Sequence, residues 1–298
     1  MNDSPIFRPL PGLFEPSAVQ QLPDGRFFAV EDEKDAPFST FRIAADGTAI
    51  SAPLAPGFPV LNDLEGLAAD QAGRLYAITS HSRDSKGEAH PDREQLIRFR
   101  IEGAQVLEPR SATDFKAALL DAHPIFAEAV AERDVKGRGG LNVEALEIEP
   151  ATGALMIGLR SPVLDGRAII VSVTNPDAVF DRGEPMQIAP DLISLDLGGD
   201  GLRGMAFVPD WNGYLLISGP AAKSRVPFKL WFWQGSAGQV PQRVQTDGMA
   251  DFAHAEGICP ARIAGQSKIV IVSDDGSRKS GRFAQFAIID LQNLKPSD

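Results

Sequence analysis

The stretch Leu64-Glu65-Gly66-Leu67-Ala68, followed by Gly73-Arg74-Leu75-Tyr76-Ala77-Ile78-Thr79-Ser80, decides the fold of this chain. Apolar residues alternate with small or polar ones in both halves, and glycine marks the reversal. This pattern predicts a strand, a turn and a second strand. The unit recurs along the chain, and its five copies begin at Ser17, Glu65, Glu144, Arg203 and Glu256.

Each copy is followed by further strand and turn signals, so the repeating unit has four strands, although the fifth copy shows only three clear ones. In the third copy the outer strands are expected over Ala168 to Val173 and near residues 185–188. Radial repetition of such units is typical of a β-propeller. We therefore expect an all-β fold with five blades, or six if one blade is degenerate, in a single domain over residues 1–298. The segment around Ile6-Phe7-Arg8 is expected to supply the missing edge strand of the fifth blade. The rival interpretation, a pair of β-sandwiches, does not predict the same signature five times.

One helical pattern interrupts the repeats, around residues 114–135, where apolar residues recur at helical spacing. It falls in the longest interval between repeat starts, from Glu65 to Glu144. We interpret it as an insertion packed on the outside or over one face, and not as an additional blade.

Composition excludes several classes of partner. The chain has 298 residues, with 29 basic against 40 acidic residues and a net charge of −11, so polyanions such as nucleic acids are repelled. No apolar run approaches membrane-spanning length, and no membrane partner is expected. The N-terminal residues lack the pattern of a secretory signal, which predicts a cytoplasmic location. The single cysteine, Cys259, is expected to pack as a small hydrophobic residue.

Propeller geometry predicts a polar rim. The first strand of a blade lines the central tunnel and the second runs antiparallel to it, so the start of one meets the end of the other. The expected neighbours are Ser17 with residues 31–33, Glu65 with His81 and Arg83, Glu144 with Arg160, Arg203 with Ser218, and Glu256 with Asp274 and Asp275.

Two interpretations of this rim stay open. In the structural one, the glutamates accept backbone hydrogen bonds and pair with the arginines, which braces the blades. In the functional one, the tunnel mouth is a ligand or metal site, because acids with few compensating cations suit a hard ion such as calcium. The sequence Asp274-Asp275-Gly276 is the best candidate for ion ligation, although it lacks the spacing of an EF-hand loop.

Candidate site residues follow from the functional interpretation. His81 and His254 lie beside the rim and are candidates for a general base. No Gly-x-Ser-x-Gly elbow, phosphate-binding glycine loop or His-Glu-x-x-His motif is present. The predicted catalytic residues are Glu65, Glu144, Glu256 and His81; the predicted substrate-binding residues are Arg83, Arg160, Arg203 and His254; the predicted metal ligands are Asp274 and Asp275.

Several segments together resemble a known family. They are Asp63-Leu64-Glu65-Gly66-Leu67, Ser80-His81-Ser82-Arg83, Asn142-Val143-Glu144-Ala145-Leu146, Ile157-Gly158-Leu159-Arg160-Ser161-Pro162-Val163, Arg203-Gly204-Met205-Ala206 and Ala255-Glu256-Gly257-Ile258. They resemble the bacterial domain-of-unknown-function family DUF3616 over nearly the whole chain. This resemblance implies a propeller and no assigned activity.

The Glu-Gly-Leu repeats are also similar, more distantly, to phytase-like esterase domains and calcium-dependent lactonases. Those proteins are propellers with acidic tunnel mouths. This chain differs from them in having Ala145 in place of the second glycine and Arg203 in place of a fourth glutamate.

Two classes of function follow. The first is a metal-assisted hydrolase of small esters, lactones or phosphoesters, with calcium as the implied cofactor and a small molecule bound in the tunnel mouth. The second is a non-catalytic propeller scaffold that binds a ligand or a protein. The polar chemistry that converges on the rim favours the first class, and exposed aromatic residues on the other face would favour the second.

Overall fold

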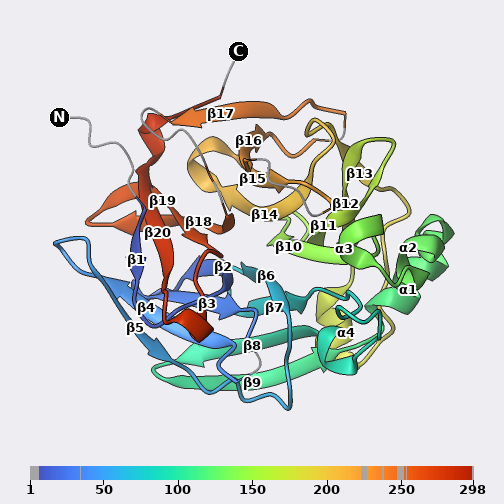
Figure 1. Ribbon diagram of the computed structural model, residues 1–298, viewed down its shortest axis with the longest axis horizontal. Coiled ribbons are helices and arrows are strands. Elements are labelled where there is room, and N and C mark those ends of the chain that lie inside the picture. Colours follow the sequence, from blue (N-terminus) through green and yellow to red (C-terminus); the bar gives the residue numbers. More distant parts are fainter. Residues whose placement is uncertain are drawn as a thin grey trace.

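The chain forms five antiparallel sheets arranged as blades around a central axis (Figure 1). The computed structural model describes residues 7–33, 35–222, 227–236, 238–246, 252 and 254–296. The predicted five-bladed β-propeller is confirmed, and neither a sixth blade nor a sandwich is present among the described residues.

Within each blade the strands follow one another outward from the axis. The first two sheets contain β2 (Pro16–Gln21), β3 (Phe27–Glu31), β4 (Phe38–Ile43) and β5 (Ala49–Pro53), then β6 (Leu64–Ala69), β7 (Leu75–Thr79), β8 (Leu96–Glu102) and β9 (Gln105–Ala112). The third contains β10 (Asn142–Ile148), β11 (Leu155–Leu164), β12 (Arg167–Val173) and β13 (Ile193–Leu195). The fourth contains β14 (Gly201–Val208), β15 (Gly213–Gly219), β16 (Lys229–Trp233), β17 (Gln242–Thr246) and β21 (Leu294–Pro296). The fifth contains β18 (Ala255–Ile263), β19 (Gln266–Ser273), β20 (Ala284–Asp290) and β1 (Arg8–Leu10).

The ring is closed by strands from the two ends of the described chain. Strand β1 pairs with β20, with Arg8 opposite Phe286, so the N-terminal segment completes the fifth blade as the sequence predicted. Ile6, which that prediction also named, lies outside the described residues. Strand β21 pairs with β17 and adds a fifth strand to the fourth blade, which the sequence analysis did not foresee. Both pairings cover an outer edge that would otherwise expose unpaired backbone groups.

The hydrophobic core is divided into layers, because each blade is apolar on both faces. Each layer lies mainly between two neighbouring blades. For example, Val19 and Phe27 of the first blade pack with Val270 and Phe286 of the fifth. Cys259 is buried in the same layer as a free thiol, and burial raises its pKa. It therefore packs as a small apolar residue, as expected.

All five inner strands carry a β-bulge at the same place. The register of each inner hairpin shifts at Ser17, Glu65, Glu144, Arg203 and Glu256. A bulge leaves one residue without a partner across the ladder and redirects its side chain. The repeat therefore aims one polar residue per blade toward the same end of the axis.

The residue after each bulge is small because neighbouring inner strands approach closely there. A Cβ atom at Gly66 would lie 2.7 Å from the Leu146 Cβ and 2.9 Å from the Leu146 backbone nitrogen. A Cβ at Gly257 would lie 2.9 Å from the Ala18 Cα. The second residue of Glu-Gly-Leu is thus fixed by backbone contact between blades. Only a void of about 10 Å³ remains at this level of the axis, so the tunnel is closed in its middle.

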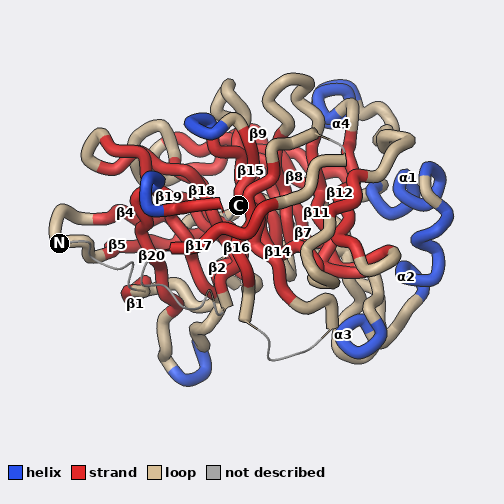
Figure 2. Tube along the Cα trace, turned by 90° about the horizontal axis from the view of Figure 1, so that it is seen from above, coloured by secondary structure: helices blue, strands red, loops and turns tan. Residues whose placement is uncertain are grey.

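Helices lie outside the ring. They are α1 (Phe115–Ala122), α2 (Ala127–Ala131), α3 (Val135–Arg138) and α4 (Pro176–Arg182), with the short 3-10 turns η1 (Pro91–Arg93), η2 (Pro124–Phe126), η3 (Pro209–Trp211), η4 (Arg278–Ser280) and η5 (Leu291–Asn293). The helical insertion predicted around residues 114–135 is confirmed as α1, α2 and the start of α3. Helices α3 and α4 lie toward opposite faces of the ring (Figure 2). Among the described residues, none of these helices combines the length and the apolar character that crossing a bilayer requires.

The outer part of the third blade differs from the sequence analysis. The predicted outer strand near residues 185–188 is wrong: Ile188 makes one isolated bridge to Val173, and the outer strand is β13. Helix α4 was missed, although Pro176 stands in its first turn and Gly183 adopts the left-handed C-cap conformation. Both are ordinary helix boundary signals.

Candidate functional site

A polar cavity of about 760 Å³ occupies the α3 side of the propeller, where the inner strands begin. We call it the α3-side cavity. Arg133, Asp134 and Val135 form part of its wall, so the helical insertion covers one side of the tunnel mouth. The insertion packs there on the loop after β7, where a Cβ atom at Gly87 would lie 2.7 Å from the Arg133 Cβ.

The bulged residues of all five blades line this cavity, as the repeat predicted. They are Ser17, Glu65, Glu144, Arg203 and Glu256. Asp32 and Asp274, which follow the second strands of blades one and five, line it as well. The convergence of the rims is confirmed, whereas the chemical roles of these residues stay predictions.

Three of the bulged residues belong to an ionic brace, a network of ion pairs that joins three blades. An Arg203 guanidinium nitrogen lies 2.8 Å from the Glu144 carboxylate and 3.1 Å from the Glu256 carboxylate. Arg160 donates to the other oxygen of Glu144 at 2.9 Å, as the rim geometry predicted. The Arg203 guanidinium also lies 4.7 Å from the centre of the Phe228 ring. Arg203 is only 6% exposed, so its contacts hold blades together in a site from which water is largely excluded.

A second group of residues in the cavity consists of carboxylates with few cations nearby to compensate their charge. Asp32, Asp63 and Glu65 offer oxygen atoms that all lie within 4.8 Å of one another. Glu65 forms no hydrogen bond or ion pair with any described residue, and its charged neighbours include Glu144, Asp63 and Asp32. Two oxygens bound to one calcium ion at about 2.4 Å each are at most about 4.8 Å apart. The spacing therefore fits a shared cation of this kind.

Asp63 is held in place by three donors on one of its oxygens. Ser80 and Arg93 both contact Oδ2, and the Ser82 hydroxyl donates to the same atom at 3.2 Å. These contacts orient the Asp63 carboxylate. They also explain the Ser-His-Ser segment, whose two serines lie on the cavity side.

Sequence reasoning missed Asp63 as a site residue and gave Asp32 no role. The sequence contained a feature that could have identified each of the two residues. Asp63 stands two residues before Glu65 in the repeated motif, and Asp32 was expected beside Ser17 on rim geometry. Arg93 carried no such signal, because it comes from η1, a turn that lies outside the repeat.

Four carboxyl groups of the cavity, those of Asp32, Glu65, Glu256 and Asp274, have raised pKa values. Burial, and then the neighbouring Asp63, raise the pKa of Asp32 to about 8, although solvent reaches this side chain from the cavity. Burial, and then the charge of Glu144, raise the pKa of Glu256 to about 7. Burial also raises the pKa values of Glu65 and Asp274 well above those of ordinary carboxyl groups. These groups are costly to ionise together unless a cation compensates their charge.

The raised pKa values of these acids predict an unusual dependence of the free energy of unfolding on pH. Acids whose native pKa is raised keep their protons in the folded state at pH values where the unfolded chain has lost them, so the free energy of unfolding will fall as pH rises from about 6.5 to about 8. Each extra proton bound by the native state contributes a slope of about 1.4 kcal/mol per pH unit. The opposite contribution of His81, whose pKa burial lowers to about 4, is complete below this window.

Urea denaturation at several pH values in the presence of a chelator measures this slope. The variant Asp274→Asn should flatten it, because one of the protonating groups is removed. A free energy of unfolding that is constant or rises over the window would contradict the assignment of raised pKa values.

The structure places three of the predicted site residues away from the cavity walls. The His81 ring is buried against the Phe115 ring of α1, with Nδ1 2.9 Å from the Thr79 carbonyl oxygen. His254 is exposed, with its ring 6.3 Å from that of Phe228. Asp275 accepts hydrogen bonds from Ser273 and Gln285, both at 2.6 Å. Its carboxylate is thus engaged within its own blade, and it does not line the cavity as Asp274 does.

Two of the three arginines predicted to bind substrate remain for a ligand. Arg83 lines the cavity, donates to the Gly87 carbonyl oxygen at 3.3 Å and forms no ion pair among the described residues. Arg160 uses one nitrogen on Glu144, and its side chain is 15% exposed. By contrast, Ser218, expected beside Arg203, donates to Asp200 at 3.0 Å and accepts from Trp231 at 2.9 Å. The cavity therefore has an acidic part at Asp32, Asp63 and Glu65, and a cationic part at Arg83 and Arg160.

Solved structures with a similar fold are found, at low sequence identity. A putative oxidoreductase (glucose dehydrogenase) from Thermus thermophilus is 14% identical with a TM-score of 0.46, and the match covers 96% of this chain and 100% of the other. A PQQ-bound aldose sugar dehydrogenase from Streptomyces coelicolor is 16% identical with a TM-score of 0.45, covering 95% and 98%. The allergen Mala s 1 from Malassezia sympodialis is 14% identical with a TM-score of 0.45, covering 100% and 83%. Similarity at this level concerns the fold alone and carries no argument about activity.

Sequence comparison gives the family. No curated protein matches the chain. The profile of the family described as "Protein of unknown function (DUF3616)" matches residues 64–288, which include the bulged residues of four blades. Because this match spans most of the chain, the protein belongs to the DUF3616 family.

Proposed function

We propose that the α3-side cavity binds a divalent cation of the calcium type and hydrolyses a small ester, lactone or phosphoester that carries an anionic group. The observation that carries the proposal is the Glu65 carboxylate, which lies among other carboxylates and has no partner among the described residues. The proposed cation ligands are Asp32, Asp63 and Glu65, with Asp274 at the same cavity wall.

The residue types fit a hard cation. All the proposed ligands are carboxylates, and the cluster contains neither sulfur nor imidazole donors. Ser80, Ser82 and Arg93 orient Asp63, as outer groups commonly do around metal ligands. A bound cation would compensate the carboxylates and polarise the ester carbonyl or phosphoryl oxygen.

The remaining residues supply binding and proton transfer. Arg83 and Arg160 are placed to hold the anionic group of the substrate, because guanidinium groups bind carboxylate and phosphate through paired hydrogen bonds. Glu256, with a pKa of about 7, can hold or release a proton near neutral pH. Arg203 takes no direct part, since its carboxylate contacts join the blades.

Cation binding is tested first. Calcium added to chelator-treated protein should raise the melting temperature, and more so at about pH 8 than at about pH 6.5, because protons compete for the ligands. Saturation at about 100 times the dissociation constant corresponds to about 2.7 kcal/mol of stabilisation. Glu65→Gln and Asp32→Asn should abolish the shift, whereas Asp275→Asn should keep it, because Asp275 is engaged within its own blade.

Hydrolysis is tested with 4-nitrophenyl acetate, 4-nitrophenyl phosphate, bis(4-nitrophenyl) phosphate and a small lactone, each with calcium and with chelator. We expect calcium-dependent turnover that Glu65→Gln removes, and a KM for an anionic substrate that Arg83→Ala raises at least about tenfold. No shift of the melting temperature and no calorimetric signal with calcium would overturn the cation site. Calcium binding without turnover of any substrate would overturn the enzymatic part and favour the non-catalytic scaffold.

A further inference from the structure

A second cavity, of about 560 Å³, lies at the other end of the propeller axis. We call it the α4-side cavity. It is formed by the turns of the inner hairpins, and Arg74 at its edge pairs with Asp177 of α4. The closed middle of the tunnel separates it from the α3-side cavity. A ligand bound here would therefore be independent of the proposed hydrolytic site.

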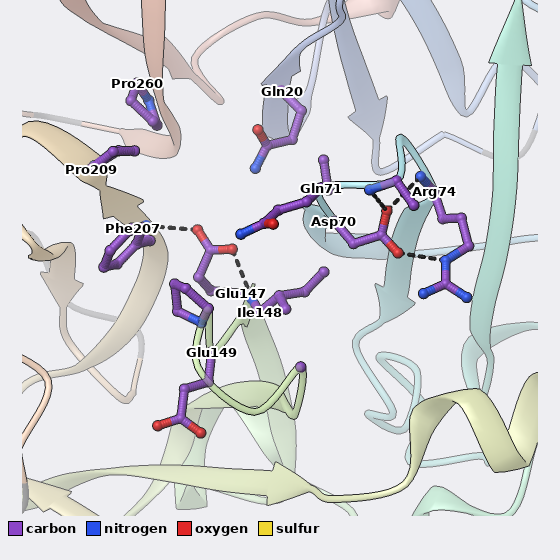
Figure 3. A pocket seen from close by; sticks show the side chains of 14 residues that line it. Gln20, Asp70, Gln71, Arg74, Glu147, Ile148, Glu149, Phe207, Pro209 and Pro260 are labelled. Atoms are coloured by element: carbon purple, nitrogen blue, oxygen red, sulfur yellow. Dashed lines mark hydrogen bonds and ion pairs between the residues drawn. The ribbon is translucent and has the colours of Figure 1, made fainter.

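The walls of the α4-side cavity are largely apolar and stiff. Ile148, Phe207, Pro209 and Pro260 contribute to them (Figure 3). Cavities of this size with apolar walls and few polar groups are typical of small-molecule sites. The polar groups in the wall then decide which molecule is bound.

The central polar group is Glu147, which is only 6% exposed. Its two oxygens accept hydrogen bonds from the backbone nitrogens of Ile148, at 2.7 Å, and Phe207, at 2.6 Å (Figure 3). No cation among the described residues pairs with it, because the nearby Arg74 is engaged by Asp70 and Asp177. Burial raises the pKa of Glu147 to about 7.

The two backbone hydrogen bonds of Glu147 occupy its oxygens but supply no counter-charge. Gln20 stands at the corresponding place in the first blade, three residues after the bulge, and its amide reaches the neighbouring inner strand at the Leu67 carbonyl oxygen, 3.5 Å away. A neutral side chain thus bridges to the next blade there, whereas Glu147 bears the cost of burying a carboxyl group. The amides of Gln20 and Gln71 point toward the same space as the Glu147 carboxylate (Figure 3).

We propose that the α4-side cavity binds a small organic amine, with its ammonium group on Glu147 and its apolar body against Phe207, Pro209 and Pro260. The ammonium supplies the missing counter-charge, and the amide oxygens of Gln20 and Gln71 can accept its remaining hydrogens. A carboxyl group in an apolar wall favours this class over anions and over neutral apolar molecules.

Benzylamine is the probe, with benzyl alcohol as its neutral counterpart of the same shape. Titration calorimetry should give a dissociation constant of about 1 mM for benzylamine, as expected of a ligand of this size. Benzyl alcohol should bind at least about tenfold more weakly. Glu147→Gln should reduce the benzylamine affinity at least about tenfold, and Glu149→Gln, on the half-buried rim where Thr152 donates to it, should change it less than about twofold.

Two further measurements locate the site. The affinity of the unmodified protein for benzylamine should rise from about pH 6 to about pH 8, because Glu147 ionises in this interval while the amine stays charged. Glu65→Gln should not weaken binding, since Glu65 belongs to the other cavity. Equal binding of benzylamine and benzyl alcohol, no effect of pH, or a loss with Glu65→Gln in place of Glu147→Gln would overturn the proposal.

Discussion

Gly66→Ala is expected to destabilise the protein by about 3 kcal/mol, a large part of the stability of an ordinary domain. The added methyl would lie 2.8 Å from the Ile78 Cγ2 and 2.9 Å from the Leu146 backbone nitrogen. Cβ contacts closer than about 3 Å are not tolerated, and a backbone atom of the next blade cannot turn aside as a flexible side chain would. Urea denaturation followed by circular dichroism measures the loss.

Ala145→Gly is the matched control for this substitution. Ala145 holds the corresponding position in the third blade, and its replacement disturbs an inner strand without adding atoms. We expect a loss of about 1–2 kcal/mol from the deleted methyl and the freer backbone. If Gly66→Ala costs no more than this control, the close approach of β6 and β10 does not explain the glycine of the motif.

Arg203→Met is expected to cost about 3–5 kcal/mol, the range for removing one partner of a buried ionic cluster. The substitution leaves Glu256 without its ion-pair partner among the described residues, and leaves Glu144 with Arg160 as its one ion-pair partner there. The pKa of Glu256 will rise further, because Arg203 now lowers it. The loss of stability should therefore be larger at about pH 8 than at about pH 6.

Arg278→Met provides an exposed comparison with similar chemistry. Arg278 pairs with Glu33 at 2.8 Å and lies 4.4 Å from the Phe14 ring centre, but its side chain is 48% exposed. Its loss should cost at most about 1 kcal/mol. Equal costs for the two substitutions, measured by urea denaturation, would show that the Arg203 cluster is not a brace between blades.

The repeat allowed most of the architecture to be predicted from sequence. Alternating apolar residues with glycine turns mark the inner hairpins, and these signals are local, so five blades and the closing N-terminal strand could be anticipated. The outer strand of the third blade was misplaced because α4 and the segment after it come between β12 and β13 in the chain. Strand β21 was missed because its pairing with β17 joins segments far apart in the chain.

The candidate site, like the fold, could be predicted from the sequence only in part. Sequence alone identified the five bulged residues, because a strand start in each repeat must reach the same end of the axis. It did not separate their environments. Glu144 and Glu256 share Arg203, whereas Glu65 has no partner among the described residues. The position of the His81 side chain could not be predicted either. Its neighbours Ser80 and Ser82 contact Asp63, whereas the His81 ring packs against Phe115.

The sequence by itself therefore determined a propeller of five or six four-stranded blades and the polar residue that each blade presents at one end of the axis. Only the tertiary structure decided which carboxylates are paired and which are left to a ligand, that the tunnel is closed in the middle, and that a buried glutamate faces a second cavity. The physical reason is that strand periodicity depends on neighbours along the chain, whereas charge compensation and desolvation depend on which side chains the blades bring together in space.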